Sequence, residues 1–147
     1  GPMPYKVLKP TEARIIAAMA GGVIPRGGAS FALGAADLED TWLPRTDHLL
    51  SRMPLATRLA LRLAARVLNY AWPLIYMKKL TPLTALDEQE RTELFHIIEN
   101  SPPPGPQTIL VVKVLVFPAF YGLPEVKEAI GYRERFALSP DYVGPKD

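Results

Sequence analysis

The run Ile-Leu-Val-Val-Lys-Val-Leu-Val-Phe at residues 109–117 decides the fold class of this chain. Its β-branched residues give strong strand propensity, yet a helix buried nearly all round would have the same composition. We find no partner strand elsewhere in the sequence, and the unpaired backbone groups of a lone strand would be costly to bury. We therefore expect a helix that Pro118 kinks late. The fold class that follows is all-α, a small single-domain bundle of about five to six helices with proline-rich connectors.

Two helices are expected in the first third of the chain. Thr11 can cap a first helix that runs to about Val23. The stretch from Ile24 to Gly34 is rich in glycine and contains proline, which predicts a loop. Helical periodicity then resumes from Leu38 to Met53, and Pro44 should kink or split that helix.

A third helix is expected from Pro54, which suits a first helical turn, to about Trp72. Apolar residues recur along this segment at helical spacing, which predicts a face that packs on the core. The residues expected on that buried side are Leu55, Leu59, Leu63, Val67 and Leu68.

The second half of the chain carries clear start and stop signals. Asp87, followed three positions later by Glu90, forms a capping signature for a fourth helix that ends near Asn100. The proline-rich segment 102–106 should stop that helix and act as a stiff connector. A last short helix is expected over residues 124–130, with Gly131 as its C-terminal stop.

Domain boundaries and compartment follow from the ends of the chain. Residues 1–2 resemble a scar left by removal of an expression tag, residues 3–10 an N-terminal extension, residues 11–133 the helical domain and residues 134–147 an irregular tail. The segment after Met3 has neither an apolar signal core nor an Arg-Arg pair, so we expect a cytoplasmic protein by its own sequence. The longest apolar stretch has 15 residues, against the 20 or so of a spanning helix, so membrane contact is expected to be at most peripheral.

Charge is distributed unevenly although the net charge is only +2. Between Thr41 and Thr84 there are seven basic residues and one acid, Asp47, whereas the expected fourth helix is acidic. Arg58, Arg62 and Arg66 recur every fourth residue and should form one ridge on the third helix. This ridge could be solvated, paired within the chain or used for a partner. The weak net charge argues against nucleic acid.

Residues that could carry chemistry are scarce. The sequence has no cysteine, and its two histidines, His48 and His96, lack metal-site spacing, so we expect no catalytic, cofactor or metal-binding residue. The acids Asp37, Glu39 and Asp40 fit the first turn of a helix, where they complement its dipole. The glycine pairs 21–22 and 27–28 lack a phosphate-binding pattern and are expected to form a turn.

Four short motifs, in order, resemble the gluconate 2-dehydrogenase small-subunit family. They are Ile24-Pro25 after a helix, Ala-Ala-Asp-Leu-Glu-Asp at 35–40, Leu-Asp-Glu-Gln-Glu-Arg at 86–91, and Phe-Tyr-Gly-Leu-Pro-Glu at 120–125 closing on Ile-Gly-Tyr at 130–132. The match covers roughly residues 10–133.

The resemblance implies a non-catalytic accessory subunit that binds and stabilises or matures the large subunit of a flavin-dependent dehydrogenase of the glucose-methanol-choline type. FAD is expected in that large subunit, and a cytochrome subunit could belong to the same complex. Many family members begin with a twin-arginine signal, which is not found here. The complex would therefore be periplasmic or membrane-peripheral only if exported with a signal-bearing partner.

Large aromatic residues and arginines dominate interface hot spots, which suggests candidate partner-binding residues. These are Arg58, Arg62, Arg66, Trp72, Tyr76, Phe120, Tyr121 and Tyr132. Core packing is the competing interpretation for the aromatic ones. Two other functions stay open at this point: an independent helical ligand-binding domain and a peripheral membrane-contacting protein.

Overall fold

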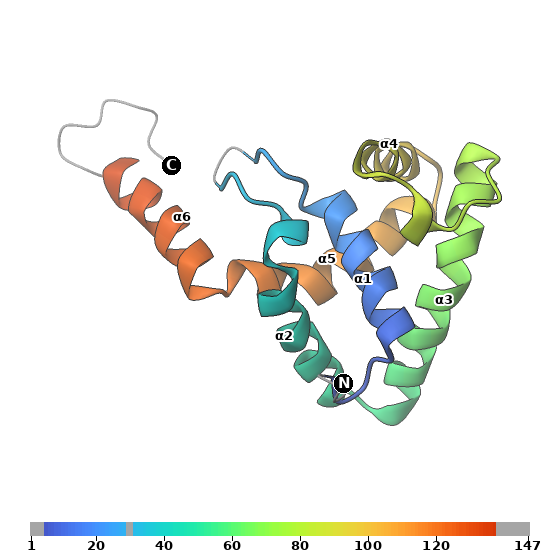
Figure 1. Cartoon of the computed structure of the whole chain (residues 1–147), viewed down its shortest axis with the longest axis horizontal. Helices are drawn as coiled ribbons and strands as arrows, with labels where there is room; N and C mark the ends of the chain where they lie inside the picture. Colours follow the sequence, from blue (N-terminus) through green and yellow to red (C-terminus); the bar gives the residue numbers. More distant parts are fainter. Residues whose placement is uncertain (1–4, 29–30, 138–147) are drawn as a thin grey trace.

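The computed structural model describes the backbone of residues 5–28 and 31–137, and side chains as far as Gly131. All regular structure in this part of the chain is helical, which confirms the all-α prediction (Figure 1). The α-helices are α1 (Pro10–Val23), α2 (Glu39–Ser51), α3 (Leu55–Met77), α4 (Glu88–Glu99), α5 (Gly105–Tyr121) and α6 (Pro124–Ala137). Two short 3-10 turns, η1 (Ala35–Leu38) and η2 (Leu83–Ala85), precede α2 and α4.

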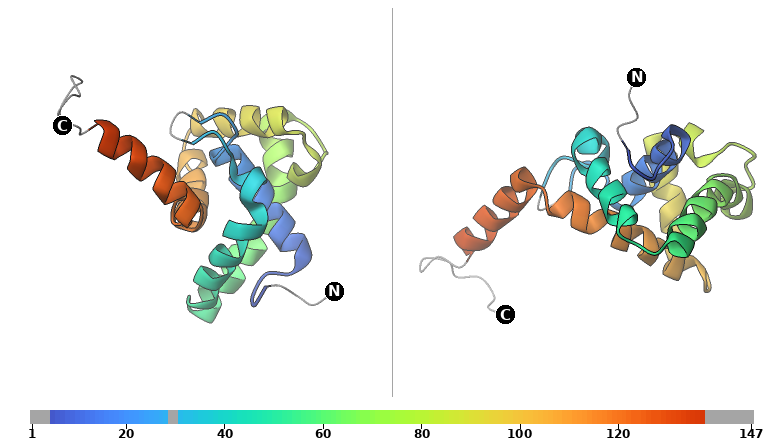
Figure 2. Two further views of the ribbon diagram at one scale, coloured as in Figure 1. Left: turned by 60° about the vertical axis from the view of Figure 1, so that its left-hand side comes forward. Right: turned by 90° about the horizontal axis from the view of Figure 1, so that it is seen from below.

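Helix α1 is the centre of the bundle and contacts α2, α3, α4 and α5 (Figure 1). Its buried residues include Ile15, Ile16 and Met19, interspersed with alanines whose short side chains let neighbouring helices approach closely. Helix α6, by contrast, extends from the end of α5 away from the other helices, as the further views confirm (Figure 2). The core therefore forms around α1.

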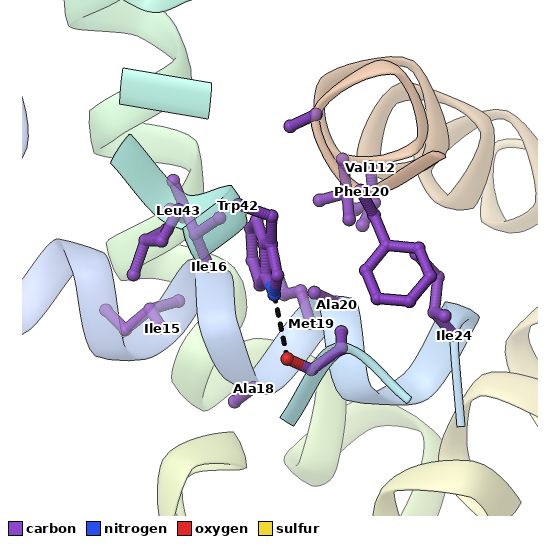
Figure 3. Packing of buried hydrophobic residues seen from close by; sticks show 14 of the residues in the cluster. Ile15, Ile16, Ala18, Met19, Ala20, Ile24, Trp42, Leu43, Val112 and Phe120 are labelled. Atoms are coloured by element: carbon purple, nitrogen blue, oxygen red, sulfur yellow. Dashed lines mark hydrogen bonds between the residues drawn. The ribbon is translucent and has the colours of Figure 1, made fainter. Parts of the chain in front are cut away.

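The core joins residues from every part of the bundle around α1. Trp42 of α2 is fully buried, and its indole N–H donates to the carbonyl of Ala35 at 2.7 Å (Figure 3). Phe120 of α5 belongs to the same cluster and lies close to Ile24, on the side away from Leu43 (Figure 3). Burying an indole together with its hydrogen-bond partner fixes α2 and η1 against α1.

The apolar run that raised the choice between strand and helix is helical, as expected. Ile109, Val112 and Val116 of α5 are buried at helical spacing. The helix begins at Gly105, so the end of the expected proline-rich connector is already its first turn. Pro118 lies inside the helix, which continues to Tyr121.

Three expected helix boundaries are wrong. Helix α1 begins at Pro10, and its first turn is closed by Glu12, whose carboxylate accepts the N–H of Lys9 at 2.9 Å, so Thr11 is not the cap. Helix α3 passes Trp72 and ends at Met77. Helix α6 passes Gly131 and continues to Ala137, so residues 134–137 are helical and the rest of the expected tail lies outside the described residues.

The expected buried side of α3 is also wrong. Leu55, Leu59, Leu63 and Val67 are 60%, 50%, 63% and 55% exposed, and only Leu68 is half-buried. The helix instead packs on α1 and α4 through Ala65, Asn69 and Trp72. Helix α3 therefore has more apolar surface than its contacts with the core can bury.

Membrane-spanning potential is low for individual helices. No single helix among the described residues is long and apolar enough to cross a membrane. Helix α5 and residues 124–131 of α6 are long and apolar enough only when the two are taken together, and they are bent by 84° relative to each other.

Candidate protein-docking surface

Six exposed apolar residues of α3 form one continuous stripe. Leu55, Leu59, Leu63, Val67, Tyr70 and Leu74 follow one another at intervals of three or four residues. This spacing places them along one side of the helix over about 28 Å, at 1.5 Å per residue. We call these six residues the α3 stripe. Contiguous exposed apolar surface of this extent is typical of an interaction site.

A groove runs beside the α3 stripe, between α3 and α5. Its volume is about 380 Å³. Leu8, Ile16 and Met19 line it from the N-terminal segment and α1. The remaining lining residues come from α2, α3 and α5: Leu50, Ala60, Leu61, Arg62, Ala64, Ala65, Leu68, Gln107, Thr108, Val111, Val112 and Leu115.

The hollow shape of the groove follows from the sequence of its walls. Ala60, Ala64 and Ala65 lie where a longer side chain would fill the space. On the opposite wall Val111 is 46% exposed, and its neighbours Leu110 and Val114 are 58% and 57% exposed. The groove and the α3 stripe thus form one apolar surface that extends over two helices.

The predicted arginine ridge is partly paired within the chain. Arg62 and Arg66 donate through Nε to the two carboxylate oxygens of Glu12, at 2.9 and 2.8 Å. Arg58 donates to the carbonyl of Ser51 at 3.3 Å. The acidic helix α4 is paired with other cations, Lys79 with Glu90 and Lys113 with Glu99. One carboxylate for two guanidinium groups leaves the cluster of Glu12, Arg62 and Arg66 with one net positive charge.

Glu12 is the buried member of this cluster, with 3% of its side chain exposed. Burial by itself would raise the pKa of Glu12, but the N–H of Lys9 and the guanidinium groups of Arg66 and Arg62 together hold the pKa below its ordinary value. The carboxylate therefore serves two purposes. It closes the first turn of α1 and it fastens α3 to α1.

Neutralising Glu12 tests this fastening. Because Glu12 is buried while Arg62 and Arg66 are partly exposed, we expect Glu12→Gln to lower the free energy of unfolding by about 2 kcal/mol at neutral pH. A carboxyl with a lowered pKa stabilises the fold above its ordinary pKa and loses that contribution as the pH falls through the folded-state pKa. When urea unfolding is measured from neutral pH to below about pH 4, the free energies of unfolding of the parent protein and of Glu12→Gln should thus converge as the pH falls. Glu93→Gln, on the exposed side of α4, is the matched control, and an equal loss in both variants would contradict this role of Glu12.

The aromatic candidates divide between core and surface. Trp72 and Phe120 are 3% and 1% exposed, so core packing is the correct interpretation for these two. Tyr76 is half-buried, Tyr121 is 38% exposed, and the side chain of Tyr132 lies outside the described residues. The exposed leucines of α3 and Val67 were missed as surface candidates because their helical spacing is equally typical of a core-facing side.

A second, polar hollow of about 360 Å³ lies between α1, η1 and α4. Its arginines are largely engaged: Arg26 donates to Asp37 at 2.7 Å and to Glu88 at 2.5 Å, and Arg91 donates to the carbonyls of Leu83 and Thr84. Burial first, and then the charge of Asp40, raise the pKa of the neighbouring Glu39. These contacts tie the loop after α1 to α4.

The acidic residues near η1 close turns or begin a helix, and the glycine pairs belong to α1 and to the loop after it. Asp37 accepts the N–H of Gly34 at 2.8 Å and so closes η1, while Glu39 and Asp40 lie in the first turn of α2.

Gly21 and Gly22 lie inside α1, so the expected turn there is wrong, whereas Gly27 has φ 83° in the loop. His48 and His96 are exposed, and no group of three or more metal-ligating side chains occurs within the described residues.

Comparison with known proteins yields no relative. No family model matches the chain, no curated protein matches it, and no solved structure matches its fold.

Proposed function

We propose that this chain is a non-catalytic accessory subunit that binds and stabilises or matures a larger protein. One observation carries the proposal: the α3 stripe and the adjoining groove leave an apolar surface exposed along two helices. Exposing so many large aliphatic side chains to water is unfavourable, and burying them against a partner removes that cost.

The class of the partner is inferred from the four sequence motifs. Their resemblance to the gluconate 2-dehydrogenase small-subunit family suggests the large subunit of a flavin-dependent dehydrogenase of the glucose-methanol-choline type. That subunit would hold the FAD and catalyse the reaction, and a cytochrome subunit could join the same complex. The compartment would be that of the partner.

The positions of these motifs in the fold are consistent with an accessory role. Asp37 closes the turn before α2, and Asp87 with Glu90 forms the capping box of α4, in which the Glu90 N–H donates to Asp87 at 2.8 Å. Leu123 and Pro124 lie at the junction of α5 and α6. These three motifs thus begin or join helices, a structural task that suits a subunit whose contribution is its surface.

Co-expression tests the proposal. When a flavin-dependent dehydrogenase large subunit of the glucose-methanol-choline type is co-expressed with this chain, it should be recovered through a tag on this chain, in soluble form and with the visible absorbance of bound flavin. Expressed alone, the same large subunit should give a lower yield of soluble, flavin-loaded protein. Equal yields in both cases, together with no co-purification, would exclude the accessory role.

A further inference from the structure

We propose that the groove between α3 and α5 receives one amphipathic helix of the partner, with an apolar face flanked by Asp or Glu residues. This inference rests on the proposed function, because the helix belongs to the large subunit. It adds to that function a defined binding site and the chemistry of the segment that occupies it.

The length of the groove matches a short helical contact. Its lining residues on α3 run from Ala60 to Leu68, and those on α5 from Gln107 to Leu115. Each stretch rises about 12 Å at 1.5 Å per residue. A helix that docks through residues i, i+3 or i+4, and i+7 presents apolar anchors over about 10.5 Å, so two turns of a partner helix would fill the groove.

The composition of the groove favours aliphatic anchors. Apolar side chains supply most of its lining, and its depth comes from the alanines at 60, 64 and 65. The lining includes three side chains with polar groups, namely Arg62, Gln107 and Thr108. A partner residue entering between the two walls would therefore be surrounded mainly by methyl and methylene groups, which suits leucine, isoleucine or valine.

Charge identifies what should flank those anchors. Helix α3 carries Arg58, Arg62 and Arg66, helix α5 carries Lys113, and neither helix contains an acid. Glu12 and Glu99 together offset two of these four cations, which leaves two positive charges in excess on this side of the bundle. Carboxylates beside the apolar anchors would complement this potential and speed association.

A second copy of this chain fits the groove less well. It would present the same basic helices, so α3 or α5 would meet a like-charged surface. Its acidic helix, α4, has its apolar residues Leu94, Phe95 and Ile98 buried in its own core. A lipid surface fits less well too, because a bilayer could contact the convex α3 stripe but would leave the concave groove unfilled.

Two variants on opposite walls test the groove. Ala64→Trp fills it, and Val111→Asp places a carboxylate where an acidic helix should dock. Both positions are exposed, so the fold should be retained, which circular dichroism and urea unfolding would verify. Gln89→Trp on the exposed side of α4 is the control for adding an indole to the surface. The probe is the purified, flavin-loaded large subunit, with affinity measured by titration at low and high salt.

We expect Ala64→Trp and Val111→Asp each to weaken binding at least tenfold, Gln89→Trp to bind as the parent does, and added salt to weaken parental binding. Equal affinity for all four proteins would overturn the groove assignment while leaving the accessory role intact. Failure of every protein, the parent included, to bind would overturn the accessory role and the groove proposal together. Self-association abolished by Ala64→Trp would assign the groove to a second copy and overturn the proposal. Binding to phosphatidylserine vesicles that is abolished by Ala64→Trp would also overturn the proposal, because a lipid would then occupy the groove.

Discussion

Replacing Asp47 with asparagine is expected to lower the free energy of unfolding by about 4 kcal/mol, because one buried carboxylate accepts three backbone N–H groups. Its side chain binds the N–H of Lys6 at 2.6 Å and those of Val7 and Leu8 at 2.9 Å each. An asparagine has a single acceptor oxygen and would direct its NH₂ group at the remaining donors. Residues 6–8 would then lose their attachment to α2, and with it the position of Leu8 in the groove.

Urea unfolding measures this loss. Asp40→Asn is the matched control because Asp40 lies on the exposed side of the same helix, and its effect should stay within about 0.5 kcal/mol. If Asp47→Asn were as mild as its control, the carboxylate would not be what holds the N-terminal segment.

The adjacent glycines 21 and 22 should respond in opposite directions to the same substitution. Both lie in α1, where alanine is the better helix former by about 1 kcal/mol. A Cβ on Gly21 would meet no atom within 4 Å, so Gly21→Ala should stabilise the protein. A Cβ on Gly22 would lie 2.6 Å from ring carbons of Phe95, which packs edge-on against Trp72 with a centroid distance of 5.4 Å. Both rings are buried, so moving the Phe95 ring aside would disturb the core.

Gly22→Ala should therefore lower the free energy of unfolding by about 2 kcal/mol, and the two variants should differ by about 3 kcal/mol. Thermal or urea unfolding of the pair gives this difference without reference to any other protein. Stabilisation by both substitutions would mean that α1 and α4 do not pack as closely as their contact at Phe95 indicates.

Local signals in the sequence were enough to predict most of the fold. Asp87 and Glu90 form the expected capping box, and the loop after α1 lies where glycine and proline accumulate. The helix at Ile109 to Phe117 was predicted against its strand propensity, because an isolated strand would leave backbone groups unpaired. Each of these predictions depends on the chain within a few residues, or on the absence of a pairing partner.

The candidate site could not be predicted in the same way. Helix α3 is apolar over more than half of its circumference, and only its packing on α1 and α4 decides which residues are covered. Ala65 and Trp72 are buried, while Leu59 and Leu63 are exposed, although all four have side chains suited to a core. The pairing of Arg62 with Glu12 likewise joins residues 50 positions apart. Such contacts arise from tertiary packing rather than from local periodicity.

Hydrogen–deuterium exchange of the free chain and of its complex with the flavin-loaded large subunit would locate the surface that the partner covers. We expect slower exchange in α3 and α5 within the complex, because a docked helix suppresses local opening of both walls of the groove, and little change in α4. Unchanged exchange in α3 and α5 within an isolated complex, or the failure of any complex to form, would contradict the claim that this apolar surface exists to hold another polypeptide.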